Sequence, residues 1–164
     1  MFPVHVPKDQ VETIGTYLVN DHARCGALFS EVQQALEDGH WKQTAQAFAC
    51  YDDALERHLL IEERIVFPAF EKAVHSLATP SMAMRTEHLG IRAIVQRLAN
   101  AIAERSAAAA SAHAAALDQL MRRHQASEAG LLYPMIERVL ALRQDSLLAA
   151  MRMFGAMDVA ARAA

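Results

Sequence analysis

The chain is poor in the residues that interrupt helices or cross-link small folds. Six glycines and five prolines in 164 residues favour long helices over many short strands. There are only two cysteines, Cys25 and Cys50, and they do not form a Cys-x2-Cys metal motif. So few thiols suit a reducing cytoplasm, in which the chain carries no disulfide.

Neither the charge nor the hydropathy points to nucleic acid or to a membrane. The formal net charge is only -3, and no basic block is suited to a phosphate backbone. No run of about 18 apolar residues is free of charges, as a membrane-spanning helix would require. The first eight residues, MFPVHVPK, lack the basic start and long apolar stretch of a signal peptide. We therefore expect a cytoplasmic protein that binds neither nucleic acid nor a membrane.

What the chain does have is a repeated motif. Residues 58–68 read HLLIEERIVFP and residues 124–134 read HQASEAGLLYP. Both copies follow His-x3-Glu-x4-aromatic-Pro, and the second begins 66 positions after the first (124 − 58). The same offset relates Asp21-His22 to Glu87-His88. The chain therefore contains two half-units, each with an acidic-His pair followed by a His-x3-Glu pair.

Apolar residues recur at steps of three and four along four segments, and this period predicts four helices. The first is expected to begin near Asp9 and to end at Asp38-Gly39. The second should run from about Trp41 to the low seventies, where Pro68 should kink or loosen it. The third follows residues 79–81, and the turn to the fourth lies in the alanine-rich residues 106–116.

These segments predict an all-α fold. Because 53% of the residues are apolar, a chain of this length can bury one sizeable core. We predict an up-down-up-down four-helix bundle over residues 1–142. Residues 143–164 carry apolar side chains at helical spacing, which predicts a short C-terminal fifth helix that packs on the bundle or on a partner.

The repeated polar residues lie inside the apolar seams of these helices. With a rise of about 1.5 Å per residue, the helix lengths on either side of each turn place them at one level of the bundle. This predicts a metal site with six ligands: His22, His58, Glu62, His88, His124 and Glu128. Imidazole with carboxylate suits iron, and also zinc or manganese. Inward-facing His and Glu are how bundles hold such metals.

The number of donors is right for two ions. If Glu62 and Glu128 both bridge, each ion receives two nitrogens and two oxygens. A bridging oxo or hydroxo group would make five ligands and leave one position open on each ion for a small molecule. Such a site binds ligands and undergoes redox chemistry, whereas a closed structural site does not.

Other polar residues near the seams are expected to have different roles. Asp21 and Glu87 each precede a ligand candidate and are expected to accept the ring N–H of a neighbouring ligand histidine. Glu87 could instead line an access route, bind metal where Met84 does not, or be a solvated acid. Glu63 is expected to be a surface or interhelical carboxylate. Three further histidines are expected to lie too far from the site or at the bundle end: His40, His75 and His113.

The combined motifs resemble hemerythrin-like (HHE cation-binding) domains of the bacterial type, over roughly residues 10–142. The likeness implies a four-helix bundle holding a non-haem diiron centre that binds dioxygen, nitric oxide or peroxide, with the same six residues as iron ligands. Two departures separate the chain from oxygen carriers. Met84 stands where they have a further histidine, and His124-x3-Glu128 stands where they have His-x4-Asp.

Three functions are compatible with this pattern. The first is a diiron protein that binds or senses a small oxidant. The second is peroxide breakdown, or iron donation to damaged iron–sulfur centres, so enzymatic activity stays open. The third is a bundle that uses its metal only for stability. Ferritin-type oxidases are disfavoured because they carry Glu on two helices and Glu-x2-His on the other two. Either a monomer or a homodimer fits the sequence.

Overall fold

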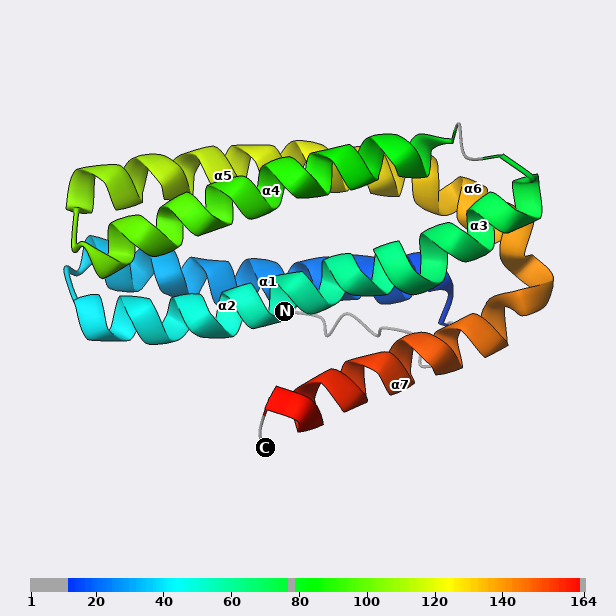
Figure 1. The fold of residues 1–164 in the computed structure, drawn as a ribbon, viewed down its shortest axis with the longest axis horizontal. Coiled ribbons are helices and arrows are strands. Elements are labelled where there is room, and N and C mark those ends of the chain that lie inside the picture. The colour runs from blue at the N-terminus through cyan, green and yellow to red at the C-terminus, as the bar shows by residue number, and fades with distance from the viewer. Residues whose placement is uncertain (1–11, 77–78, 163–164) are drawn as a thin grey trace, which may run out of the picture.

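A computed structural model describes residues 12–76 and 79–162, and these residues form helices joined by short turns. Four long rods lie side by side (Figure 1). Two of them form the first hairpin and two the second: α1 (Ile14–Glu37), α2 (Trp41–Ile61), α4 (Pro80–Ala103) and α5 (Ala107–Ser127). The predicted all-α bundle is confirmed.

The second and fourth rods continue beyond α2 and α5 through a π-helical turn. The continuations are η1 (Glu62–Val66), α3 (Phe67–Val74), η2 (Glu128–Leu132) and α6 (Tyr133–Leu140). Each π turn lies just before a proline, which lacks the N–H that an α-helix needs. The N–H of Phe67 bonds the carbonyl of Glu62, and that of Tyr133 bonds the carbonyl of Glu128. The loosening expected at Pro68 is therefore a widened turn, and it begins at Glu62.

The first helix starts later than predicted. Glu12 and Thr13 precede it, and Thr13 is its N-cap, with a capping box in which the Thr13 side chain accepts from the N–H of Thr16 at 3.1 Å. The predicted start near Asp9 is thus wrong, because the cap that satisfies the free N–H groups lies four residues further on. Asp9 itself lies outside the described residues.

The other boundaries follow the expected turn residues. Helix α1 ends before Asp38-Gly39, where Gly39 has a positive φ of 70°. Thr79 precedes α4, and Pro80 is its first residue. The turn between α4 and α5 is confined to residues 104–106, so most of the alanine-rich stretch is helical.

The core consists of two apolar clusters with a polar layer between them. Along α1, Leu18 belongs to one cluster and Cys25 to the other, and His22 lies between them. On α4, His88 lies in the same way between Met84 and Ile91. The bundle therefore encloses a buried band of imidazoles and carboxylates near the middle of its length.

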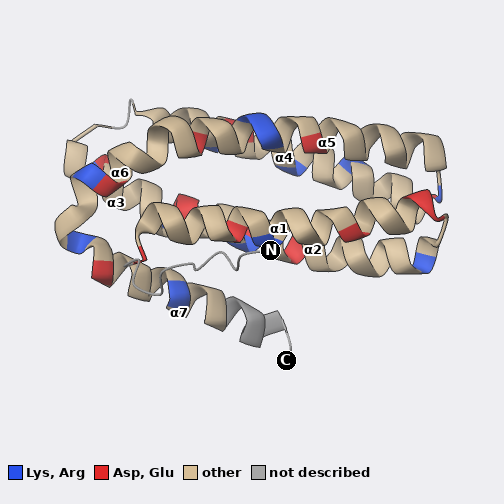
Figure 2. Ribbon diagram, turned by 180° about the vertical axis from the view of Figure 1, so that it is seen from behind, with Lys and Arg blue, Asp and Glu red and all other residues tan. Residues whose placement is uncertain are grey.

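The C-terminal segment packs on the bundle itself. After a short 3-10 turn, η3 (Ala141–Arg143), helix α7 (Gln144–Arg162) runs back along α1 and α2 (Figure 1). In the part of α7 whose side chains the structure describes, Leu147, Leu148 and Met151 are buried. None of the described helices is long and apolar enough to cross a bilayer. In Figure 2, basic and acidic residues are interspersed over the visible helices.

Candidate metal centre

Four histidines and two glutamates from four rods meet in the polar layer. His22 comes from α1, His58 from α2, His88 from α4 and His124 from α5, while Glu62 and Glu128 are the first residues of η1 and η2. His22 is 8% exposed and each of the other five is 1% exposed or less. The structure thus brings together the six residues that the repeat singled out.

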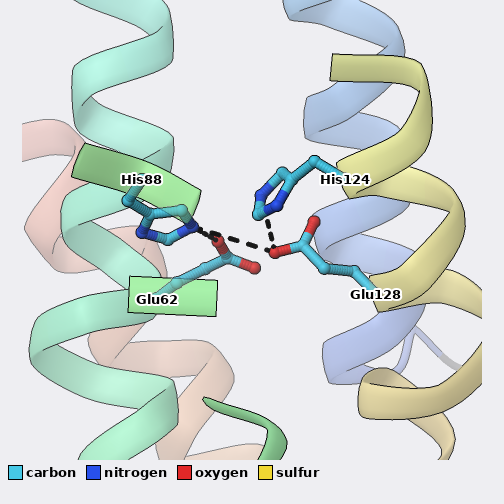
Figure 3. A group of neighbouring side chains, drawn as sticks. All are labelled: Glu62, His88, His124 and Glu128. Carbon is cyan, nitrogen blue, oxygen red and sulfur yellow. Dashed lines mark ion pairs between the residues drawn. The ribbon is translucent and has the colours of Figure 1, made fainter. Parts of the chain in front are cut away.

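Four of these side chains form one group that could hold a metal ion: Glu62, His88, His124 and Glu128. Figure 3 shows them pointing toward one another from the two hairpins. His88 Nε2 lies 3.4 Å from Glu62 Oε2 and 3.9 Å from Glu128 Oε1. His124 Nε2 lies 3.0 Å from Glu128 Oε1.

A second group adjoins the first and shares Glu128 with it: His22, His58 and Glu128. His22 Nε2 lies 3.0 Å from His58 Nε2 and 3.1 Å from Glu128 Oε2. Glu128 therefore directs one oxygen to each group. Glu62 Oε2 also lies between the groups, 3.6 Å from His58 Nε2 and 3.4 Å from His88 Nε2.

The donor atoms are arranged better for binding a metal ion than for hydrogen bonding with one another. Among the described residues, four buried side-chain atoms have no hydrogen-bond partner: Glu62 Oε2, His88 Nε2, His124 Nε2 and Glu128 Oε1. They belong to the four residues of the first group, and each unsatisfied atom costs about 1–3 kcal/mol. Ligands about 2.0–2.2 Å from one ion lie roughly 3 Å apart, close to the shorter spacings here. A cation would satisfy all four atoms.

Three carboxylates behind the histidines fix which ring nitrogen faces inward. Asp21 Oδ2 lies 3.1 Å from His58 Nδ1 and Glu87 Oε2 lies 2.8 Å from His124 Nδ1, as expected for acceptors of a ring N–H. Glu63 Oε1 lies 2.8 Å from His88 Nδ1. A histidine that donates through Nδ1 keeps a lone pair on Nε2, and that lone pair is what a metal binds.

Glu63 is the residue whose part the sequence did not reveal. It is an interhelical carboxylate, as expected, but it also orients His88. Arg92 holds it with two contacts, Nη1 to Oε1 at 2.7 Å and Nη2 to Oε2 at 3.2 Å. Although burial would raise the pKa of Glu63, its bonds with Arg92 and His88 lower it. No repeat could have flagged it, because position 129 in the other half is alanine.

The buried carboxylates of the layer favour positive charge beside them. Burial alone would lower the pKa of His88, but the nearby carboxylates of Glu128 and Glu62 raise it to about 10. The pKa of His58 is raised against burial by Glu62, and that of His124 by Glu128. Burial would raise the pKa of Glu128, yet the histidines around it hold that pKa far below its usual range. Without a metal, protons must supply the charge.

Tyr133 is a second residue of the site that sequence reasoning missed. Its hydroxyl donates to Glu62 Oε1 at 2.7 Å and to Glu128 Oε2 at 3.1 Å, and it lies 3.2 Å from His22 Nε2. Its ring stacks on His22, with centroids 5.8 Å apart. Burial, followed by the charges of Glu62 and Glu128, raises the pKa of Tyr133. The signal was present in the repeat, since the aromatic position of the first copy is Phe67.

The remaining candidates lie apart from both groups. Met84 is buried in the apolar cluster that also holds Leu18. Cys25 is buried in the other cluster, and burial raises the pKa of its thiol to about 12. Neither group found in the described part of the chain includes a further histidine: His40 and His75 are exposed, and His113 is half-buried.

The comparison with known families agrees with this geometry. The family model of the hemerythrin HHE cation binding domain matches residues 13–136, about three quarters of the chain and all six inward-facing residues. The chain belongs to the hemerythrin HHE cation-binding family. No curated protein and no solved structure matched it. In this hemerythrin-family bundle, the buried His and Glu group is compatible with iron or another metal ion.

Proposed function

We propose that this hemerythrin-family protein is a non-haem diiron protein that binds or senses a small oxidant, namely dioxygen, nitric oxide or peroxide. The observation that carries the proposal is the division of six buried donors into two adjacent groups that share Glu128. Two histidines belong to each group, and Glu62 lies within 3.6 Å of a histidine from each. This arrangement supports two ions with the glutamates between them.

The donor set favours iron and leaves room for a ligand. Imidazole with carboxylate suits iron, and also zinc or manganese. Two histidines and the two glutamates would hold each ion, which leaves room beside them for a small ligand. When bound, the ions would supply redox chemistry and a position at which a small oxidant binds. The protein's part is to orient the imidazoles through Asp21, Glu63 and Glu87 and to keep bulk water out of the layer.

The test starts with anaerobic purification and metal analysis. Two iron ions per chain are expected; one ion, or zinc alone, would contradict the proposal. Dioxygen, nitric oxide and peroxide are then added in turn while the visible spectrum is recorded. A reversible new absorption supports binding. Repeated consumption of peroxide would replace binding with peroxide breakdown, and transfer of iron to a cluster-free acceptor protein would replace it with iron donation.

A further inference from the structure

The two half-units anchor their helices in the same way. Glu71 on α3 accepts a hydrogen bond from the Ser81 hydroxyl at the start of α4, at 2.7 Å. Its equivalent 66 residues later, Glu137 on α6, accepts from the N–H of Gly15 at the start of α1, at 3.1 Å. Because these two contacts match, residues 66 positions apart can be compared directly. The differences between such residues show how the two sides of the metal layer differ.

On one side of the layer, between α3 and α4, charged side chains close the access to the metal centre. The guanidinium of Arg85 lies 5.4 Å above the Phe67 ring. Its Nη1 donates to the carbonyl of Glu63 at 3.2 Å, and its Nε and Nη2 lie 3.3 Å from the carboxylate of Glu71. Arg92 holds the Glu63 side chain from the other direction. A small molecule would have to displace this network to reach His88.

On the other side, between α1 and α6, small residues occupy the equivalent positions. Val19 stands in place of Arg85, Ala129 in place of Glu63, and Gly15 in place of Ser81. These three residues, with Tyr133 and Glu137, help to line a groove of about 230 Å³ between α1 and α6. The volume is ample for a molecule of two or three atoms, since one water occupies about 30 Å³ in the liquid.

Tyr133 links the groove to the metal layer. Tyr133 lines it, and the hydroxyl of the same residue reaches His22, Glu62 and Glu128. His22, on which the Tyr133 ring stacks, is 8% exposed, whereas the other three histidines are 1% exposed or less. On the side between α3 and α4, Phe67 stacks on His88 with the same 5.8 Å between centroids but has no hydroxyl.

We propose that small ligands reach the buried centre through this groove and that Tyr133 is the positioning residue they meet at its inner end. The proposal rests on the metal centre proposed above and adds the side from which ligands reach that centre. The Tyr133 hydroxyl donates to Glu62 and Glu128 here, and on this side it can turn from them to a ligand that accepts a hydrogen bond, such as nitric oxide, azide or peroxide. The Arg85 network closes the other side.

The first test closes the groove by placing an arginine where Arg85 stands on the other side. Val19 is 44% exposed, so Val19→Arg should fold, and its side chain can reach Glu137 as Arg85 reaches Glu71. In iron-loaded protein we expect azide association and dissociation to slow about tenfold, equal to about 1.4 kcal/mol of added barrier, while the equilibrium constant stays unchanged. The matched control is Val19→Ala, which leaves the groove open and should keep wild-type rates.

The second test removes the hydroxyl. Tyr133→Phe copies Phe67 and leaves all six ligands in place, and azide binding is compared with wild type at equal iron content. Azide should bind about 2- to 10-fold more weakly, as the loss of one hydrogen bond predicts, and the infrared stretching frequency of added nitric oxide should shift.

The outcomes distinguish a failure of the proposed ligand route from a failure of the proposed diiron centre. Wild-type protein that takes up no metal overturns the diiron proposal and the route with it. Full iron content with unchanged azide rates in Val19→Arg, or equally slowed rates in Val19→Arg and Val19→Ala, overturns the route alone. An unshifted nitric oxide frequency in Tyr133→Phe overturns the positioning part.

Discussion

His22 Nε2 and His58 Nε2 face each other across 3.0 Å inside the bundle. The other ring nitrogen of His58 lies 3.1 Å from Asp21 Oδ2, which leaves a lone pair on the inward Nε2. Two lone pairs at this distance would repel, so a proton or a cation must lie between the rings. His88 and His124 also keep a lone pair on Nε2, because their outer nitrogens face Glu63 and Glu87. The outer carboxylates of three of the four histidines thus favour positive charge at the centre.

The first prediction concerns which histidines hold the metal. We expect His58→Ala and His124→Ala to lose most bound iron, because each removes one of the two imidazoles of a group. His113→Ala should keep the wild-type content, since His113 lies outside both groups. Iron per chain, measured after identical anaerobic loading, is the readout. Equal iron in all three variants would contradict the assignment.

The second prediction concerns metal removal. A ligand present at about 100 times its Kd stabilises the fold by about 2.7 kcal/mol, and for a chain of this size each kcal/mol moves the Tm by about 2–4 °C. Treatment with a chelator should therefore lower the Tm by several degrees, and added iron should restore it. Calorimetry of wild type and His124→Ala gives the comparison, and the variant should show no such shift. A chelator effect of equal size in both proteins would mean that the metal lies elsewhere.

The sequence predicted the bundle and the convergence of the six donors for a physical reason. Helical periodicity is local, and the offset of 66 residues tied positions in one hairpin to positions in the other. The roles of Glu63 and Tyr133 could not be predicted in this way. Glu63 meets His88 and Arg92 of α4, a tertiary contact that no local pattern encodes. Tyr133 acts through a hydroxyl that its repeat partner Phe67 lacks.

The helix start was missed for a different reason. Asp9 and Thr13 are both plausible N-cap residues, and the choice depends on which backbone N–H groups have other partners. Thr13 also donates its hydroxyl to Glu137, at the far end of the chain. That contact ties the cap to α6 and is not visible in residues 9–16.

The third prediction concerns the carboxylates behind the histidines. Glu63→Gln should weaken iron binding about 10- to 100-fold, as removal of an outer partner of a ligand histidine does. The amide leaves the size of the side chain nearly unchanged but removes the charge that supports His88. Asp118→Asn is the control, because Asp118 pairs with the exposed Arg122 and not with a histidine. Competition with a chromophoric chelator gives the affinities. Similar losses in both variants would show a general effect of charge.

The last prediction concerns pH and the two thiols. Cys25 is 2% exposed, and burial raises the pKa of its thiol from 9.0 to about 12, whereas Cys50 is exposed. At pH 8 a thiol reagent should modify one cysteine rapidly, and the second only when the chain unfolds. Because the folded pKa is raised, the stability that Cys25 contributes is complete below pH 9 and declines as the pH rises toward 12. The decline is about 1.4 kcal/mol per pH unit.

The control for this prediction is Cys25→Ser. In alkaline unfolding titrations the variant should lack the part of the pH dependence that begins at pH 9, and in denaturant it should show one reactive thiol instead of two. If Cys25 of the folded wild type reacts as fast as Cys50, its burial in the core beside Phe29 and Tyr51 is not maintained in solution. Helix α1 would then separate from the core next to the metal layer more readily than its packing indicates.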